Sequence, residues 1–461
     1  MVSVDRVRGR SWVRPHRVPD WRREALRTTL WVVPAMMVVG AVALFALTYA
    51  LDRAAAAGDL TFPGWVSAGG ADAARQVLIG LAAAIITVAG VVFSVTILAL
   101  QLASQQFGPR MLRNFIRDLG TQASLGAFVA TFVYAMLALA SVGQLAHGEF
   151  VPHLSVTVAL GLTLVDLGVL IYFINHVAKS IQLTSVVSGI ARDFRSTLED
   201  LLADAAAVRS PSDTIEQRLS GVRTRLEREG ASVPATGSGF LQAVGHDRLV
   251  RIAASTDAVI ALSKRPGQFI VEGQPLAMVW PPDAAAAVAE ALARAHIVGP
   301  NRTLTQDLAL PVDQLVEVAI RALSPAVNDT FTALTCIDWL GDCLCRAARA
   351  PLPDGIYRAP DGVVRLVDPV ITFERLLKGS YDKIRQAGRG MPAVLIRQLD
   401  NLRRVSDAGA TSHSDIIAHQ AAMILRAGEE SVPEESDRRD VQLAYAALVS
   451  ELRLGEPSAE G

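Results

Sequence analysis

The stretch that decides the fold is VLIGLAAAIITVAGVVFSVTILALQLA, which runs from Val77 to Ala103 and carries no charged residue. At about 1.5 Å per residue, a helix of this length exceeds the roughly 30 Å hydrocarbon core of a bilayer. Three further long apolar stretches lie within the first 180 residues: Leu30–Leu51, Leu125–Leu145 and Leu154–Ala178. The sequence therefore predicts an α-helical membrane domain with four transmembrane helices over residues 30–180.

The charges between these stretches predict the topology. Arginines crowd the basic segment 1–29 and return in the second connection as Arg110, Arg113 and Arg117. The first connection has Arg53 as its basic residue, and His147–His153 has no Lys or Arg. Because basic loops stay on the cytoplasmic side, both termini are expected in the cytoplasm of a multi-pass inner-membrane protein. The basic segment is a topogenic signal or a contact to anionic lipid headgroups, so membrane lipids are expected partners.

Beyond residue 180 the composition becomes that of a soluble domain. We expect a helical connector over 181–236, a small β-rich subdomain over 237–282, a mostly helical domain with one hairpin over 283–454, and a disordered tail over 455–461. The expected strands are short apolar runs between turn residues: Leu249–Ala253, Ala258–Leu262, Phe269–Val271 and Leu276–Val279. The predicted fold is thus a four-helix membrane domain followed by a mostly helical α+β cytoplasmic domain.

The second span carries a stripe of small and polar side chains. At 100° per residue they fall within an arc of about 80°. Its members include Gly80, Thr87, Gly90, Ser94, Gln101 and Gln105. Such a face permits close packing between helices. It could equally line a water-filled path for an ion or small solute.

The fourth span has an ionisable residue, Asp166, near its middle. A charge at that depth is costly, so such a residue usually has a partner or a function. Asp166 is a candidate intramembrane ion or proton site. The alternative is a neutral carboxyl bonded to a hydroxyl such as that of Thr87, Ser94 or Thr131.

Two connecting segments have further candidate roles. After Pro109, Arg110, Arg113 and Arg117 form one basic edge of a short helix, suited to headgroup anchoring, to an anion-attracting vestibule or to contact with the soluble domain. In the soluble half, two predicted helices are joined by a tight turn, called the elbow below. Its candidate residues are Ser324, Pro325, Asn328 and Asp329. Asn328 or Asp329 is suited to cap the following helix, whose free N–H groups also favour anions.

The sequence also excludes several classes of function. The 461 residues carry a net charge of −1, and the soluble half shows no basic stripe of the kind that binds nucleic acid. Cys336, Cys343 and Cys345 have neither zinc nor redox spacing, and core positions are expected for them. Because nucleophile, metal-ligand and phosphate-loop motifs are missing from the sequence, we expect no catalytic residues, metal or cofactor, and no enzyme activity.

Three stretches together resemble the DUF2254 family of predicted bacterial membrane proteins. They are Gly90–Thr96 continued by Gln105–Arg110, then Tyr172–Ala178, and then Ala322–Asp329. The chain departs from the family pattern at Thr330, where members tend to have proline, which affects only the rigidity of the elbow. The resemblance implies a multi-span inner-membrane protein with a cytoplasmic domain, and it implies no activity.

Two hypotheses for function follow. The first is a homo-oligomeric channel or pore-type transport protein with a cytoplasmic regulatory domain, in which copies of the second span surround an axis. The second is a membrane-anchored cytoplasmic sensor or scaffold without transport activity, whose spans merely pack. Leucine substitutions in the stripe separate them, because only the first hypothesis requires that face to stay small and polar.

Overall fold

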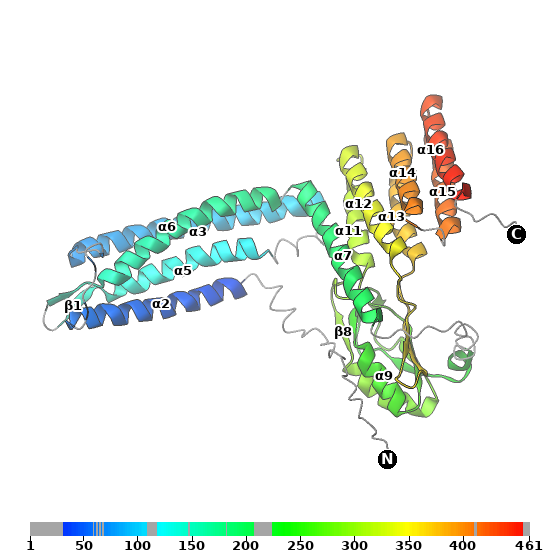
Figure 1. The fold of residues 1–461 in the computed structure, drawn as a ribbon. Coiled ribbons are helices and arrows are strands. Elements are labelled where there is room, and N and C mark those ends of the chain that lie inside the picture. The colour runs from blue at the N-terminus through cyan, green and yellow to red at the C-terminus, as the bar shows by residue number, and fades with distance from the viewer. Residues whose placement is uncertain are drawn as a thin grey trace, which may run out of the picture. The chain divides into compact units, whose positions relative to one another are not determined.

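The computed structural model describes residues 31–58, 60, 63, 66, 69–107, 118–145, 148–180, 182–206, 224–409 and 413–454. The described residues form two compact units, one within residues 21–186 and the other within residues 187–461. Figure 1 shows long helices in the first unit and a mixture of helices and strands in the second.

The first unit consists of long apolar helices: α2 (Val32–Ala56), α3 (Ala71–Phe107), α5 (Leu119–Ser141) and α6 (His153–Ser180). In the described part of the chain these four helices are long and apolar enough to cross a membrane. A short hairpin, β1 (Gly143–Leu145) and β2 (Gly148–Phe150), separates α5 from α6. The four expected spans are confirmed as helices. Their ends differ: α2 continues past Leu51, and α5 stops before Leu145 because Val142 adopts an extended conformation.

Helix α5 is the central helix of this unit and packs against α2, α3 and α6. Its Phe128, Tyr134 and Ala138 are at most 1% exposed. A Cβ at Gly126 would lie 3.1 Å from the Cα of Pro34, so α2 and α5 approach each other closely there. Because α5 is the most buried of the four, the other three helices supply most of the outer surface of the unit.

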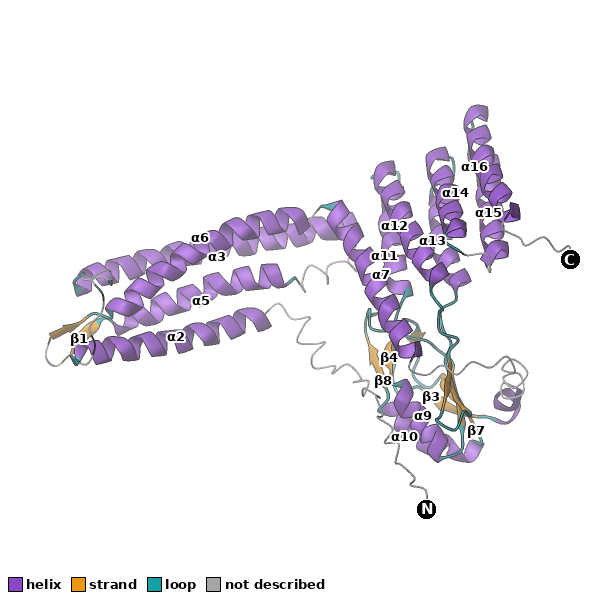
Figure 2. Cartoon of the chain, viewed as in Figure 1, coloured by secondary structure: helices purple, strands orange, loops and turns teal. Residues whose placement is uncertain are grey.

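The second unit contains two sheets, shown in Figure 2. The five-stranded sheet has the order β3-β7-β5-β10-β9: β3 (Ala231–Pro234), β7 (Pro275–Trp280), β5 (Val259–Leu262), β10 (Val364–Val367) and β9 (Ile356–Arg358). The three-stranded sheet has the order β6-β4-β8: β6 (Phe269–Ile270), β4 (Gly239–Val244) and β8 (His296–Gly299). Neighbouring strands are antiparallel except β5 and β10, which are parallel with Ile260 opposite Leu366.

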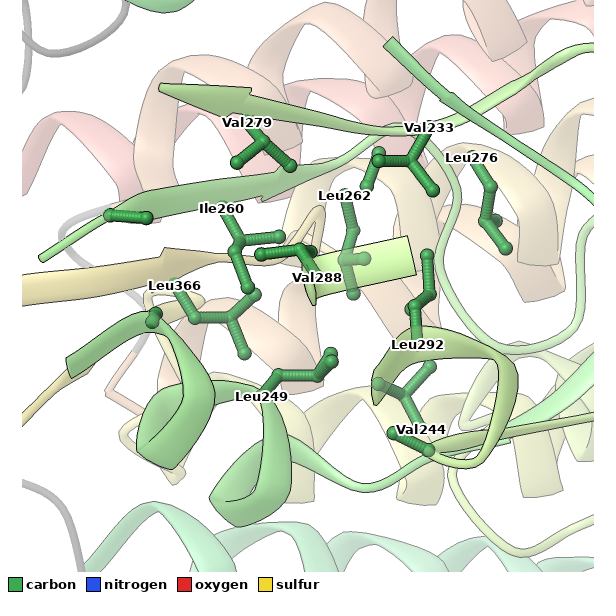
Figure 3. Close-up of a cluster of buried hydrophobic side chains, with 14 of the residues drawn as sticks. Val233, Val244, Leu249, Ile260, Leu262, Leu276, Val279, Val288, Leu292 and Leu366 are labelled. Atoms are coloured by element: carbon green, nitrogen blue, oxygen red, sulfur yellow. The ribbon is translucent and has the colours of Figure 1, made fainter. Parts of the chain in front are cut away.

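Two helices, α9 (His246–Ser255) and α10 (Ala285–Ala293), help to bury the apolar residues of the strands. Leu249 of α9 and Val288 of α10 are fully buried in one cluster with strand residues such as Ile260, as Figure 3 shows. Burying a side chain of this size contributes about 1.5–3 kcal/mol, so this cluster is the main core of the sheet region.

The other helices of this unit are α7 (Leu183–Ala206), α11 (Ala309–Ala322), α12 (Thr330–Arg349), α13 (Phe373–Ala387), α14 (Pro392–Asp407), α15 (Ser414–Ser431) and α16 (Glu435–Leu454). Contacts run from α11 to α12 and α13, from α12 to α14, and from α14 to α15 and α16 (Figure 1). Leu340 of α12 and Leu399 of α14 are fully buried, so apolar stripes hold the array together.

The structure corrects two expectations for the β-rich region. Leu249–Ala253 is not a strand, because it lies within α9 and buries Leu249 and Ala253 on one helical face. The region is also wider than 237–282, since β3, β8, β9 and β10 pair into its sheets. The hairpin of β9 and β10 is confirmed. The expectations for 1–29, for the part 207–223 of the connector and for the tail 455–461 lie outside the described residues.

Candidate functional site

The stripe of the second span lies on the side of α3 that faces away from the rest of its unit. On the opposite side, Leu78, Ile85 and Val92 are at most 3% exposed and belong to the apolar clusters between the helices. The described stripe residues are all exposed: Gly80, Thr87, Gly90, Ser94 and Gln101. A Cβ at Gly80 or Gly90 would meet no atom within 4 Å. The stripe therefore does not pack inside its own bundle.

The hydroxyl groups of the stripe are satisfied by the helix itself. Thr87 Oγ1 donates to the carbonyl oxygen of Ala83 at 2.7 Å, and Ser94 Oγ donates to that of Gly90 at 2.9 Å. Each oxygen keeps lone pairs that can accept from water or approach a cation. The side chain of Gln105 lies outside the described residues, so the described stripe ends at Gln101.

Asp166 is buried inside the unit, with an exposed fraction of 5%. Of the three hydroxyls considered from the sequence, the Thr131 hydroxyl on α5 hydrogen-bonds to its carboxyl. Thr87 and Ser94 are bonded to their own helix instead. Asp166 Oδ2 has no hydrogen-bond partner among the described residues. The carboxyl is therefore only half satisfied.

Replacing Asp166 by valine, which is close to it in volume, is expected to raise the free energy of unfolding by about 1–2 kcal/mol. The change removes a buried oxygen that lacks a partner. Chemical unfolding of the full-length protein in mixed micelles measures this difference. Asp166→Asn is the control, because it can keep the contact to Thr131 and should differ from wild type by only about 0.5 kcal/mol. A less stable valine variant would show that the carboxyl holds the helices together.

Asp118 and His176 form a polar pair that the sequence analysis did not identify. Asp118 Oδ2 lies 2.6 Å from His176 Nε2 and accepts from the N–H of Thr121 at 2.9 Å. The ring of Tyr172 stacks on His176 with centroids 5.3 Å apart. Burial raises the pKa of Asp118, but hydrogen bonds from Thr121 and His176 outweigh it and hold this pKa below its usual value. The pair joins the start of α5 to the last turns of α6.

A signal for this pair was present in the sequence. Tyr172 and His176 both belong to the stretch Tyr172–Ala178, one of the three that carry the family resemblance. A Cβ at Gly120 would lie 2.6 Å from His176 Nε2, so only a glycine leaves room for the ring there. Nothing in the sequence indicates that Asp118 is the partner of His176, however, because the two lie 58 positions apart.

The elbow in the second unit is a capped turn, as expected. Asp329 is the N-cap of α12 and accepts from the N–H of Thr332 at 3.1 Å, and these bonds hold its pKa below the usual value. Asn328 has a φ of +50°, and its N–H donates to the carbonyl oxygen of Ser324. Phe331, just beyond the cap, is 83% exposed. The elbow thus has the geometry of a structural turn.

The other candidate residues are three arginines and the cysteines. Arg110, Arg113 and Arg117 lie outside the described residues. Cys336 and Cys343 are buried in α12 as expected, and burial raises the pKa of each thiol to about 12, so they are unreactive. In the described part of the chain no group of His, Cys, Asp or Glu is arranged to hold a metal ion.

Comparison with known proteins identifies the family. The sequence matches the family DUF2254, described as a predicted membrane protein, over residues 27–404. Uncharacterized proteins of Mycobacterium bovis and of two strains of Mycobacterium tuberculosis are 33% identical over 388 residues, which is 82% of this chain and 72% of theirs. No solved structure gives a significant match. The match covers the four apolar helices and most of the second unit, and the chain belongs to the DUF2254 family of predicted membrane proteins.

Proposed function

We propose that the protein is a homo-oligomeric channel or pore-type transport protein of the inner membrane, in which α3 faces the symmetry axis. The second unit would be its cytoplasmic regulatory domain. The observation that carries the proposal is the stripe on α3, which lies opposite the packed face of that helix and is exposed along the apolar span. Four helices enclose no path by themselves, whereas symmetric copies of α3 would place Thr87 and Ser94 around one axis.

The flanks of the stripe fit the same arrangement. Ile86 and Phe93 on one side and Val91 on the other are 47–57% exposed, and their apolar side chains suit lipid or a neighbouring copy. Small residues such as Gly80 and Gly90 let helices of adjacent copies approach closely. The orientation with both termini in the cytoplasm rests on the distribution of arginines.

We expect Thr87→Leu and Ser94→Leu each to reduce ion flux by about tenfold or more, because leucine fills the path and removes the hydroxyl acceptor. The measurement is flux through the full-length protein in liposomes over a range of voltage, tension and pH. Ala84→Leu is the matched control. It adds bulk on an exposed position of α3 about 80° from the centre of the stripe, and it should conduct like wild type.

Two results would contradict the proposal. One would be that the wild-type protein gives no flux under any of these conditions. The other would be that the leucine variants conduct as wild type does. Assembly can be tested separately, because all three native cysteines lie in the second unit. On treatment of membranes with an added thiol oxidant, a Ser94→Cys variant should form disulfide-linked dimers, while Ala84→Cys should do so much less. A sensor or scaffold without transport would retain its activity in all the leucine variants.

A further inference from the structure

A cavity of about 650 Å³ lies within the second unit. Cavities that hold small molecules in proteins are about 300–1,000 Å³, so this one has the size of a metabolite site. Its walls come from the turn between β5 and β6, from the segment leading into α11 with its first turns, and from the first three turns of α13. Half of the sixteen lining residues are charged, five of them basic and three acidic.

The three acidic side chains are already paired. Asp313 accepts from Arg302, Glu374 accepts from Lys378, and Asp382 accepts from Gln420 at 3.1 Å and lies 3.6 Å from Arg385. Two basic side chains of the lining, Arg375 and Lys383, have no ion-pair partner among the described residues and are exposed. The cavity therefore presents unneutralised positive charge.

Arg265 adds a third cationic group, and its side chain is only 13% exposed. Its closest carboxylate oxygen belongs to Asp307 at 3.8 Å, and Asp307 is already bound by Arg302 at 2.6 Å. Among the described residues, the hydrogen bond of its guanidinium is a long one of 3.4 Å to the carbonyl oxygen of Pro266. Most of its five N–H donors are thus unused. A largely buried guanidinium with unused donors costs free energy unless an anion binds to those donors.

The N-terminus of α13 also favours an anion. Thr372 caps this helix of 15 residues by accepting from the N–H of Arg375, and both residues line the cavity. The free N–H groups and the positive end of the helix dipole at such a terminus favour an anion. Arg375 and Lys383 lie eight positions apart, which is about 12 Å along the helix. A ligand whose negative charges are separated is therefore better suited to contact both than a single anionic group.

We infer that this cavity is a binding site for a small polyanion whose phosphoryl or carboxylate groups contact Arg265, Arg375 and Lys383. The guanidinium fork of arginine matches the paired oxygens of either group. The site lies wholly within the second unit, which the proposed function makes the regulatory domain. Binding itself requires no conduction, so a failed flux assay leaves this inference unaffected.

The test is isothermal titration of the full-length protein in detergent micelles with pyrophosphate and, separately, with citrate. At least one of them should bind with a dissociation constant below 1 mM, and the stronger of the two identifies the anionic group. Arg375→Gln and Lys383→Gln should each weaken binding about tenfold, and Arg265→Gln by more. Arg389→Gln is the matched control, because Arg389 is exposed after α13, pairs with Glu430 and does not line the cavity.

Two outcomes would overturn the inference. One would be that neither anion binds the wild-type protein at millimolar concentration. The other would be that Arg389→Gln weakens binding as much as the cavity variants do, which would show a general attraction of anions to a basic surface. Arg265→Gln removes a partly buried side chain, so its unfolding is followed in parallel. Arg375 and Lys383 are exposed, and their variants decide the matter even if Arg265→Gln is unstable.

Discussion

Replacing Asp52 by alanine is expected to lower the free energy of unfolding of the membrane unit by about 3 kcal/mol. Asp52 lies near the end of α2, is 3% exposed, and caps the start of α6. Its Oδ1 accepts from the N–H of Leu154 at 2.8 Å, and its Oδ2 accepts from the N–H and the hydroxyl of Ser155 at 3.0 and 2.7 Å. Alanine leaves the N–H groups of Leu154 and Ser155 without this acceptor, and Ser155, which is fully buried, keeps only Thr48 Oγ1 as an acceptor for its hydroxyl.

The cap is part of a larger buried group, which makes compensation difficult. Ser155 Oγ lies 3.1 Å from Thr48 Oγ1, and Thr48 Oγ1 lies 2.8 Å from the phenolic oxygen of Tyr134 on α5. Loss of Asp52 therefore disturbs hydrogen bonds that connect three of the four helices. Ser155 and Tyr134 are fully buried, so no solvent molecule can substitute readily.

Chemical unfolding of the full-length protein in mixed micelles measures this effect. Asp52→Asn keeps an acceptor oxygen and should lose about half as much as Asp52→Ala. Arg53→Ala changes the exposed neighbour and should stay within about 0.5 kcal/mol of wild type. If Asp52→Ala and Arg53→Ala have the same free energy of unfolding, the contacts of Asp52 contribute nothing to the stability of the unit.

Hydropathy predicted the membrane unit well, but it could not predict this cap. A run of more than 20 apolar residues has few alternatives to a spanning helix, so the four helices followed from local sequence. Asp52, in contrast, directly follows the predicted span Leu30–Leu51, and nothing in the neighbouring sequence indicates a buried role for it. Its partners are more than 100 positions away, on α6, and only the packing of α2 against that helix brings them together. The same reasoning applies to Asp118 and His176.

In the second unit, the secondary structure of short apolar runs was predicted wrongly for a related reason. A run such as Leu249–Ala253 fits a strand or one turn and a half of a helix equally well. The structure resolves it as α9, whose Leu249 and Ala253 share one buried face. The strands β3, β4 and β8 were missed, and their pairing joins segments more than 40 positions apart, β3 with β7 and β4 with β8. The long helices α11 to α16 have repeated apolar positions over several turns, and their prediction is confirmed.

The basic cavity could not be found from the sequence, since its charges are scattered. Arg265, Arg302 and Arg375 lie on three separate segments, and none of these segments is basic over a run of residues. Which of the charges are neutralised depends on the ion pairs of the fold. Gly267 lies in the turn between β5 and β6 and lines the same cavity.

Gly267→Ala is expected to lower the free energy of unfolding of the second unit by about 3 kcal/mol and to weaken polyanion binding. Gly267 has a φ of +89°, and a Cβ there would lie 2.1 Å from Asp307 Oδ2. Asp307 is 1% exposed and is held by Arg302 and by the N–H of Ala309. It cannot move aside without breaking a buried ion pair, and breaking that pair also displaces Arg302 from the cavity wall.

Gly273→Ala separates the steric effect from the conformational one. Gly273 has a similar φ of +80°, but a Cβ there would meet no atom within 4 Å. Its substitution should cost only the strain of the left-handed conformation, about 1–2 kcal/mol, and should leave anion binding unchanged. Equal losses of stability in the two variants would show that Asp307 yields freely. Since Arg265 and Arg302 share that one carboxylate, a freely moving Asp307 would also pair fully with Arg265, and the cavity would lose the unused donors on which its affinity for an anion depends.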